Sequence, residues 1–113
     1  MSAQLSRDDW KGRVGGLSNA QLMRDAAVAL GLTLTIEDSW GGDLVTAAVS
    51  HLAAGVPSGQ LFAASYMNDW TVEHIAGYQP RSRDGRGPVP LGPGLGVEVD
   101  TDRLGAPLFV AGR

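Results

Sequence analysis

The chain has 113 residues, of which 43% are hydrophobic, and it carries a net charge of −3. This length allows one domain with a modest core, and the acidic balance excludes the basic surface that nucleic acid or an anionic membrane requires, so neither is an expected partner. Cysteine is absent, which excludes a disulfide framework and a thiolate zinc site and fits a reducing cytoplasm, where we expect the protein to lie.

The N-terminal end, residues 1–12, is polar and carries neither the apolar core of a signal peptide nor a helical pattern. We expect it to be irregular. No run in the chain reaches the roughly 18 apolar residues that a membrane span needs.

The first expected helix begins near Ser18, which has Gln21 three residues on, as in a capping box. Gly31 is the expected left-handed stop of this helix. Apolar residues recur between these signals at helical spacing and predict one buried face, made of Leu22, Met23, Ala26 and Leu30.

A short strand is expected over residues 32–36, where Leu32, Leu34 and Ile36 alternate with two threonines. Side chains alternate between the two faces of a strand. If the apolar set packs outward against helices, the threonines and Glu37 point the other way.

Gly41 and Gly42 interrupt the chain, and Asp43 is expected to cap a second helix that ends near Ala54. That helix is apolar on nearly all sides, which is typical of a buried helix. A second strand is expected over residues 61–66. The order helix, strand, helix, strand with short loops predicts a parallel α/β sheet with crossover helices.

The last third of the chain loses this regular pattern. Residues 71–77 are compatible with a short strand, Asp84 and Gly85 form a turn signal, and Val89 is a candidate start for a returning strand. Eight of the thirteen residues from 84 to 96 are Gly or Pro. We expect a tethered loop there, because Pro lacks the N–H that a central strand must donate.

Three stretches taken in order resemble one family: RVGGLSNAQLMRDAAVALG at 13–31, LTLTIEDSWGGDLVTAAVSHLAA at 32–54 and VPLGPGLGVEVD at 89–100. They are similar to the segments from the sixth helix to the C-terminal end of the mandelate racemase and muconate-lactonizing enzymes of the enolase superfamily. The forms IEDSWGGD and GPGLGVEVD look like those of the cis-3-hydroxy-L-proline dehydratases and the hydroxyproline-betaine epimerases. The resemblance covers residues 13–105 and leaves 106–113 as a C-terminal tail.

The resemblance implies an α/β fold that is a partial (β/α) barrel: roughly its last two strands, with flanking helices and a Gly/Pro-rich C-terminal tail. It also implies an enzyme in which Mg²⁺ binds a small carboxylate or amino-acid substrate and stabilises the enediolate formed when a base removes the α-proton. In such enzymes the metal ligands lie on the third to fifth strands, the first base is a Lys on the second, and the whole barrel needs about 250 residues. We therefore expect no metal site in this chain and no activity from it alone.

Two candidate contributions to the site depend on this resemblance. Lys11, the only lysine, is the candidate second base, although it stands two residues before Arg13 where the family places it three. Glu37 and Asp38 end the first expected strand, at the edge where barrel active sites lie, and are candidate contacts for the substrate, such as its ammonium group. The same two carboxylates also fit a solvated acidic pair or a helix cap.

Trp40 and Trp70 follow the ends of the two expected strands and are candidate substrate contacts. The resemblance implies that Trp70 is a cation–π platform for a substrate ammonium group, while an aromatic packed beneath a loop is the alternative. Asp69 fits either a substrate contact or a solvent contact. His51 is expected to be a packing residue, and His74 has no evident partner.

Two interpretations of the whole chain stay open. The first is a truncated or split product of an enzyme that abstracts the α-proton of hydroxyproline-like amino acids, a dehydratase or a racemase or epimerase, with a complementing chain as partner. The second is a small independent α/β protein that acts as a binding or interaction module. Two parallel strands leave bare sheet edges, which favour self-association.

Overall fold

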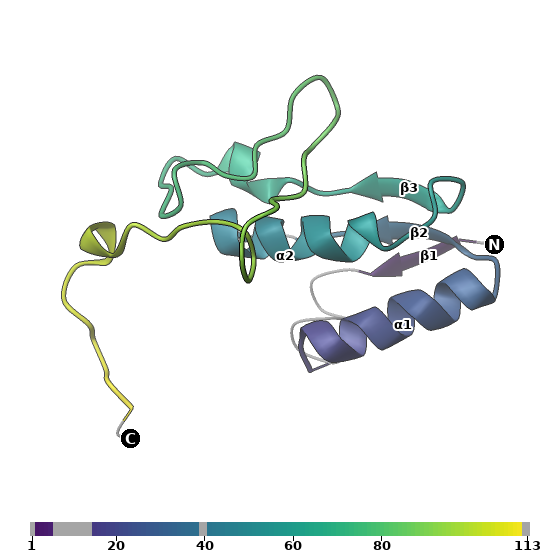
Figure 1. Cartoon of the computed structure of the whole chain (residues 1–113), viewed down its shortest axis with the longest axis horizontal. Helices are drawn as coiled ribbons and strands as arrows, with labels where there is room; N and C mark the ends of the chain where they lie inside the picture. The colour runs from purple at the N-terminus through teal and green to yellow at the C-terminus, as the bar shows by residue number, and fades with distance from the viewer. Residues whose placement is uncertain (1, 6–14, 39–40, 112–113) are drawn as a thin grey trace.

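The computed structural model describes residues 2–5, 15–38 and 41–111. Three short parallel strands form one sheet in the order β1-β2-β3, and two helices pack on it (Figure 1). The elements are β1 (Ser2–Leu5), α1 (Leu17–Ala29), β2 (Thr33–Ile36), α2 (Asp43–Ala54), β3 (Leu61–Ala64) and the short 3-10 helices η2 (Met67–Trp70) and η3 (Thr101–Leu104). The parallel α/β architecture expected from the sequence is confirmed.

Strand β1 lies within residues 1–12, which the sequence led us to expect as irregular, and it adds a strand to the two predicted from the sequence. It pairs in parallel with β2, with Ser2 opposite Thr33. Strand β2 therefore lies in the middle of the sheet, with a neighbour on each side. A strand of four residues can be held by main-chain hydrogen bonds to its neighbour, and such bonds leave little mark in the apolar pattern of the sequence.

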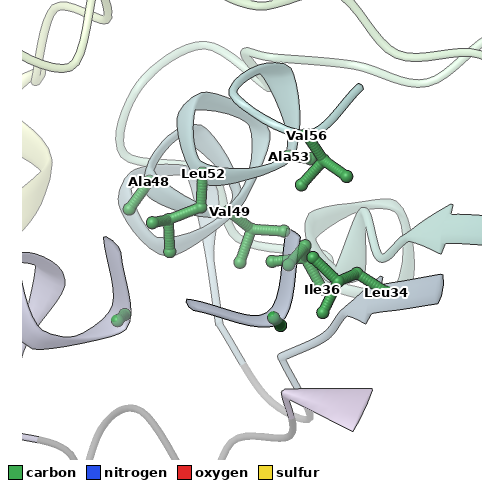
Figure 2. Close-up of a cluster of buried hydrophobic side chains, with 9 residues drawn as sticks. Leu34, Ile36, Ala48, Val49, Leu52, Ala53 and Val56 are labelled. Carbon is green, nitrogen blue, oxygen red and sulfur yellow. The ribbon is translucent and has the colours of Figure 1, made fainter. Parts of the chain in front are cut away.

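The core lies between the sheet and the two helices. Leu34 and Ile36 are fully buried on the helix side of β2, as the alternating pattern predicted. Their packing partners are mostly small side chains (Figure 2): Ala20, Ala27, Ala48, Val49, Leu52, Ala53 and Val56. Burying one leucine or isoleucine stabilises a fold by about 1.5–3 kcal/mol, so these two strand residues anchor the layer.

Helix α1 presents a different face to the core from the one predicted. Leu22 and Leu30 are 67% and 74% exposed, whereas Ala20 and Ala27 are buried. The small alanine side chains allow α1 to lie close to α2 and to the sheet, which the periodicity of the larger side chains does not reveal. The large apolar residues are left on the outer side of the helix.

The start of α1 also differs from the prediction, while its end agrees. Gly16 is the N-cap and makes no side-chain cap hydrogen bond, so the capping box expected at Ser18 is wrong. Gly15 and Gly16 both have a positive φ, which glycine adopts without strain and which starts the helix at Leu17. Gly31 has a φ of 70°, as expected for a left-handed stop.

Helix α2 matches its predicted bounds and is buried on most sides. Two long side chains connect the helices and the sheet. Arg24 Nη1 donates to the carbonyl of Leu52 at 3.3 Å, and Gln60 Nε2 donates to the carbonyls of Val28 and Leu32 at 3.1 Å. The carbonyls of Val28 and Leu52, near the C-terminal ends of the two helices, also accept from the N–H groups of Gly31 and Gly55, so the two side chains add second donors there.

From the end of β3 the chain is irregular, and residues 71–77 do not form the short strand considered from the sequence. The turn at Asp84 and Gly85 is confirmed, with φ values of 51° and 73°. Its flanking residues Arg83 and Arg86 exchange two backbone hydrogen bonds of 2.7 and 2.9 Å. This pairing stops at one bridge because Gly and Pro follow it.

No returning strand begins at Val89. The Gly/Pro-rich segment instead fastens to α2 through Leu95, which packs against the core and whose carbonyl accepts from His51 Nε2 at 3.1 Å. After η3, residues 105–111 run away from the body of the molecule (Figure 1). Among the described residues, no helix combines the length and the apolarity required to cross a membrane.

Candidate functional site

The carboxyl end of β2 presents two acidic residues in different surroundings. Leu34 and Ile36 face the helices, so the alternation along the strand places Glu37 on the opposite face, with Thr33 and Thr35. Glu37 is half-buried. In a closed parallel barrel the face of the sheet opposite the helices is the interior.

Asp38, the next residue, is only 3% exposed. Its backbone N–H donates to Ser65 Oγ at 2.7 Å, which joins the ends of β2 and β3. A Cβ placed on Gly41 would come within 1.8 Å of the Asp38 carboxylate, so the chain at Gly41 passes directly over that group.

Asp69 and Trp70 lie in η2, just after β3. Trp70 is 81% exposed. The Ser82 hydroxyl donates a hydrogen bond to Asp69 Oδ2. Both residues line a cavity of about 580 Å³ together with residues of α2, β3 and the 82–89 segment. Glu37 is not among the residues that line it, so the structure does not bring Glu37 and Trp70 into one cavity.

A buried polar cluster surrounds Asp43, the first residue of α2. Asp43 is 1% exposed, and Gly42, not Asp43, is the N-cap, which corrects the expected capping role. Asp43 Oδ1 accepts from Asn68 Nδ2 at 3.0 Å and from His74 Nδ1 at 3.0 Å, and Oδ2 accepts from the N–H of Ala76 at 2.9 Å. A carboxylate can only accept, so His74 carries its proton on Nδ1.

The electrostatics of this cluster favour an ionised Asp43. Burial raises the pKa of Asp43, but the hydrogen bonds from Asn68, His74 and Ala76, with the electrostatic attraction of His74, outweigh burial and hold the pKa below its ordinary value. The first turn of α2 adds a favourable dipole for a negative charge.

Aromatic stacking extends the cluster outward. The rings of His74 and Tyr78 are stacked with centroids 4.2 Å apart, and the guanidinium of Arg81 lies 4.8 Å from the centre of the Tyr78 ring. Partial burial raises the pKa of Tyr78, and the neighbouring Asp69 raises it further. Tyr78 has a φ of 59°, a strained value for a non-glycine residue.

The expected site residues that the structure describes are therefore not gathered in one place. Asp69 and Trp70 line a cavity shared with α2, and Glu37 does not line it. Lys11 and Trp40 lie outside the described residues. Within the described part of the chain, no group of three His, Asp or Glu side chains is placed to hold a metal ion.

The cluster at Asp43 is what the sequence did not reveal. His74 was without an evident partner, and the structure supplies one 31 residues away. The available signals were an Asp at a helix start and a His in an irregular segment, and neither predicts a contact across such a separation.

Most of the chain matches a known family. The family model described as Enolase C-terminal domain-like matches residues 11–103, which is most of the chain. The chain therefore belongs to the enolase C-terminal domain-like family. Its sheet and helices correspond to part of the C-terminal barrel domain of an enolase-superfamily enzyme.

Particular relatives narrow the comparison. A cis-3-hydroxy-L-proline dehydratase from Roseibium aggregatum is 46% identical over 96 residues, which is 85% of this chain and 26% of the relative. Two solved structures from Roseovarius nubinhibens are similar, a mandelate racemase/muconate lactonizing enzyme (TM-score 0.81, 33% identity) and a member of the enolase superfamily (TM-score 0.84, 34% identity). They cover 94% and 96% of this chain, and the chain covers 28% of each of them. The chain thus spans little more than a quarter of these relatives.

Proposed function

We propose that this chain supplies one wall of the active site of a Mg²⁺-dependent enzyme that abstracts the α-proton of a small carboxylate substrate. The substrate class is a hydroxyproline-like amino acid, and the reaction is a dehydration or a racemisation or epimerisation. The chain acts only together with the segments that hold the metal and the first base, supplied by a complementing chain or by a longer form of the same protein.

The observation that carries the proposal is the position of Glu37 in a chain 46% identical, over most of its length, to a cis-3-hydroxy-L-proline dehydratase. Glu37 ends the central strand and alternates with the core residues, on the side that a closed barrel turns inward. A carboxylate at that edge suits the ammonium group of an amino-acid substrate.

The other candidate residues have different roles in this proposal. Trp70 offers an open indole face for a cation, and Asp69, the preceding residue of the same short helix, would be a further substrate contact. Lys11 would act as the second base and Trp40 as a further substrate contact. Asp38 would contribute mainly by holding the ends of β2 and β3 together through Ser65.

In this proposal the metal is held by residues outside the described part of the chain. When bound, Mg²⁺ supplies positive charge that stabilises the enediolate. The described residues hold no group of three potential ligands, and so no step is assigned to a metal bound by them.

A chimeric enzyme tests the proposal. The matched 96 residues of the Roseibium aggregatum dehydratase are replaced by the aligned segment of this chain, and exchange of the substrate α-proton is followed by NMR in deuterated water with cis-3-hydroxy-L-proline and Mg²⁺. We expect the chimera to exchange the proton and Glu37→Gln in it to lower kcat/KM by about 10²-fold or more, as for the loss of a buried charged contact. Asp25→Asn, an exposed carboxylate on α1, is the matched control and should leave the rate unchanged.

Two results would overturn parts of this proposal. Mg²⁺-dependent exchange by the 113-residue chain alone would show that it needs no complementing segments. A folded chimera that binds Mg²⁺ and is unaffected by Glu37→Gln would remove the role given to Glu37.

A second candidate function is an independent interaction module. It is favoured by exposed apolar side chains on the outer parts of the layer, with Phe62 on β3 80% exposed and Leu22 and Leu30 on α1. Large exposed apolar areas often mark association sites. Size-exclusion chromatography separates the two: a stable folded monomer of the chain favours independence, whereas self-association or aggregation favours a piece of a larger barrel.

A further inference from the structure

The segment that carries Asp69 and Trp70 has little regular structure of its own. Between Met67 and Ser82 the structure contains one short 3-10 helix and no strand. Its backbone is held by few hydrogen bonds, among them Asp69 N–H to the Tyr66 carbonyl and Thr71 N–H to the Asn68 carbonyl. The position of this segment must therefore depend largely on side-chain contacts.

Those contacts converge on the first turn of α2. Asn68 is fully buried, its Nδ2 donates to Asp43 Oδ1 at 3.0 Å and to the Pro80 carbonyl at 2.7 Å, and its N–H donates to Thr46 Oγ1 at 3.3 Å. Ala76 donates its N–H to the other oxygen of Asp43. The Asp43 carboxylate thus binds the segment at both of its oxygens.

The outer half of the segment is joined to the same carboxylate through His74. His74 donates to Asp43 and stacks on Tyr78, and Arg81 lies over the same tyrosine ring. Ser82, next to Arg81, hydrogen-bonds to Asp69 and closes the segment on itself. Three of these links end on Asp43 itself, from Asn68, His74 and Ala76, which lie 25 to 33 positions away. Loss of the Asp43 carboxylate would therefore remove contacts at the start and in the middle of the segment.

We propose that Asp43 is a positioning residue, whose buried carboxylate fastens the segment 67–82 to α2 and thereby fixes where Asp69 and Trp70 stand. Asp43 does not contact the cavity that these two residues line, so it acts through Asn68, His74 and Ala76. This role concerns the chain itself and does not depend on which substrate the intact site takes.

Amide exchange on the 15N-labelled chain tests the proposal. Asp43→Asn keeps the size of the side chain but removes its charge and replaces one of its two acceptor oxygens by an NH₂ donor, so the donors of Asn68, His74 and Ala76 share a single neutral acceptor. We expect the Ala76 amide to exchange about tenfold faster or more, because a hydrogen bond to an ionised group is among the stronger ones in a protein. The heteronuclear NOE of the Asp69 and Trp70 amides should fall with it, while the Leu34 amide, bonded to the Gln60 carbonyl in the sheet, should change less than about twofold.

Asp25→Asn is the matched control, because it makes the same chemical change at an exposed carboxylate and should alter none of these signals. If Asp43→Asn does not fold, Asn68→Ala is measured on the same chain, with the same local loss expected at Asp69 and Trp70. Unchanged Asp69 and Trp70 signals in the folded variant, or an equal loss of protection at Leu34, would overturn the positioning role.

Discussion

Different interactions stabilise the two halves of the molecule. In the first, strands and helices bury Leu34 and Ile36 against small side chains, and the main chain is satisfied by regular hydrogen bonds. In the second, from η2 onward, the backbone is irregular, and buried polar side chains, Asp43 above all, provide the order. The regular half supplies a scaffold, and the irregular half supplies exposed groups whose position depends on a few specific contacts.

The largest effect should come from the regular half. Ile36→Ala removes a fully buried side chain from the middle strand and leaves a cavity among α1, α2 and the sheet. We expect a loss of about 2–5 kcal/mol in the free energy of unfolding, measured by urea denaturation followed by circular dichroism.

Leu22→Ala on the outer face of α1 is the matched control for this change, since Leu22 is 67% exposed. It should cost less than about 1 kcal/mol. Equal losses from the two substitutions would mean that Leu22 is covered in solution, and would point to association through α1.

A change of pH should act on the irregular half first. The Asp43 pKa is lower folded than unfolded, so the stability that Asp43 contributes is fully present above the unfolded pKa and is lost as the pH falls through the folded one. The facing charged and titratable groups are His74, Tyr78 and Arg81. As the pH falls, the protection of the Ala76 amide, taken relative to its intrinsic exchange rate at each pH, should decrease before that of the Leu34 amide.

The Asp43→Asn variant provides the control for this pH dependence. With no carboxylate at that position, the difference in exchange between Ala76 and Leu34 should no longer vary with pH below about 5. A variant that keeps the wild-type acid profile would assign the effect to another carboxylate of the chain.

The sequence predicted the regular half better than the irregular one, for physical reasons. The alternation at 32–36 and the apolar helix from Asp43 follow from local burial and were both confirmed. The prediction of the buried face of α1 was wrong, because alanines and not the larger Leu22 and Leu30 face the core. Strand β1 was not predicted, because its formation depends on pairing with β2. The Asp43 cluster joins residues 25 to 33 positions apart, and no local pattern encodes such a contact.

A smaller effect is expected where the irregular half touches the regular one. Gly87 passes against the ring of Tyr66, and a Cβ there would come within 1.9 Å of it. The Tyr66 hydroxyl also donates to the Pro88 carbonyl at 3.0 Å. Gly87→Ala should displace this segment and cost about 1–2 kcal/mol, as for other overpacked sites.

Gly59→Ala is the control for Gly87→Ala, because a Cβ at Gly59 meets nothing within 4 Å. Urea denaturation measures both, and tyrosine fluorescence or NMR of the Tyr66 ring reports the displacement. A neutral Gly87→Ala would show that the segment moves aside freely and that the halves are less firmly joined than their contacts indicate.

The smallest expected effect separates a helix-end contact from a surface ion pair. Arg24 donates to the carbonyl of Leu52, near the end of α2, and also pairs with the neighbouring Asp25 at 2.7 Å. Arg24→Met retains much of the aliphatic side chain but loses the donor, and we expect a loss of about 0.5–1.5 kcal/mol, the usual net value of one hydrogen bond. Asp25→Asn removes only the ion pair and should cost under about 0.5 kcal/mol, because Asp25 is exposed. If the two losses are equal in urea denaturation, the ion pair, and not the link from α1 to α2, accounts for the contribution of Arg24, and the two helices are joined by their alanine contacts alone.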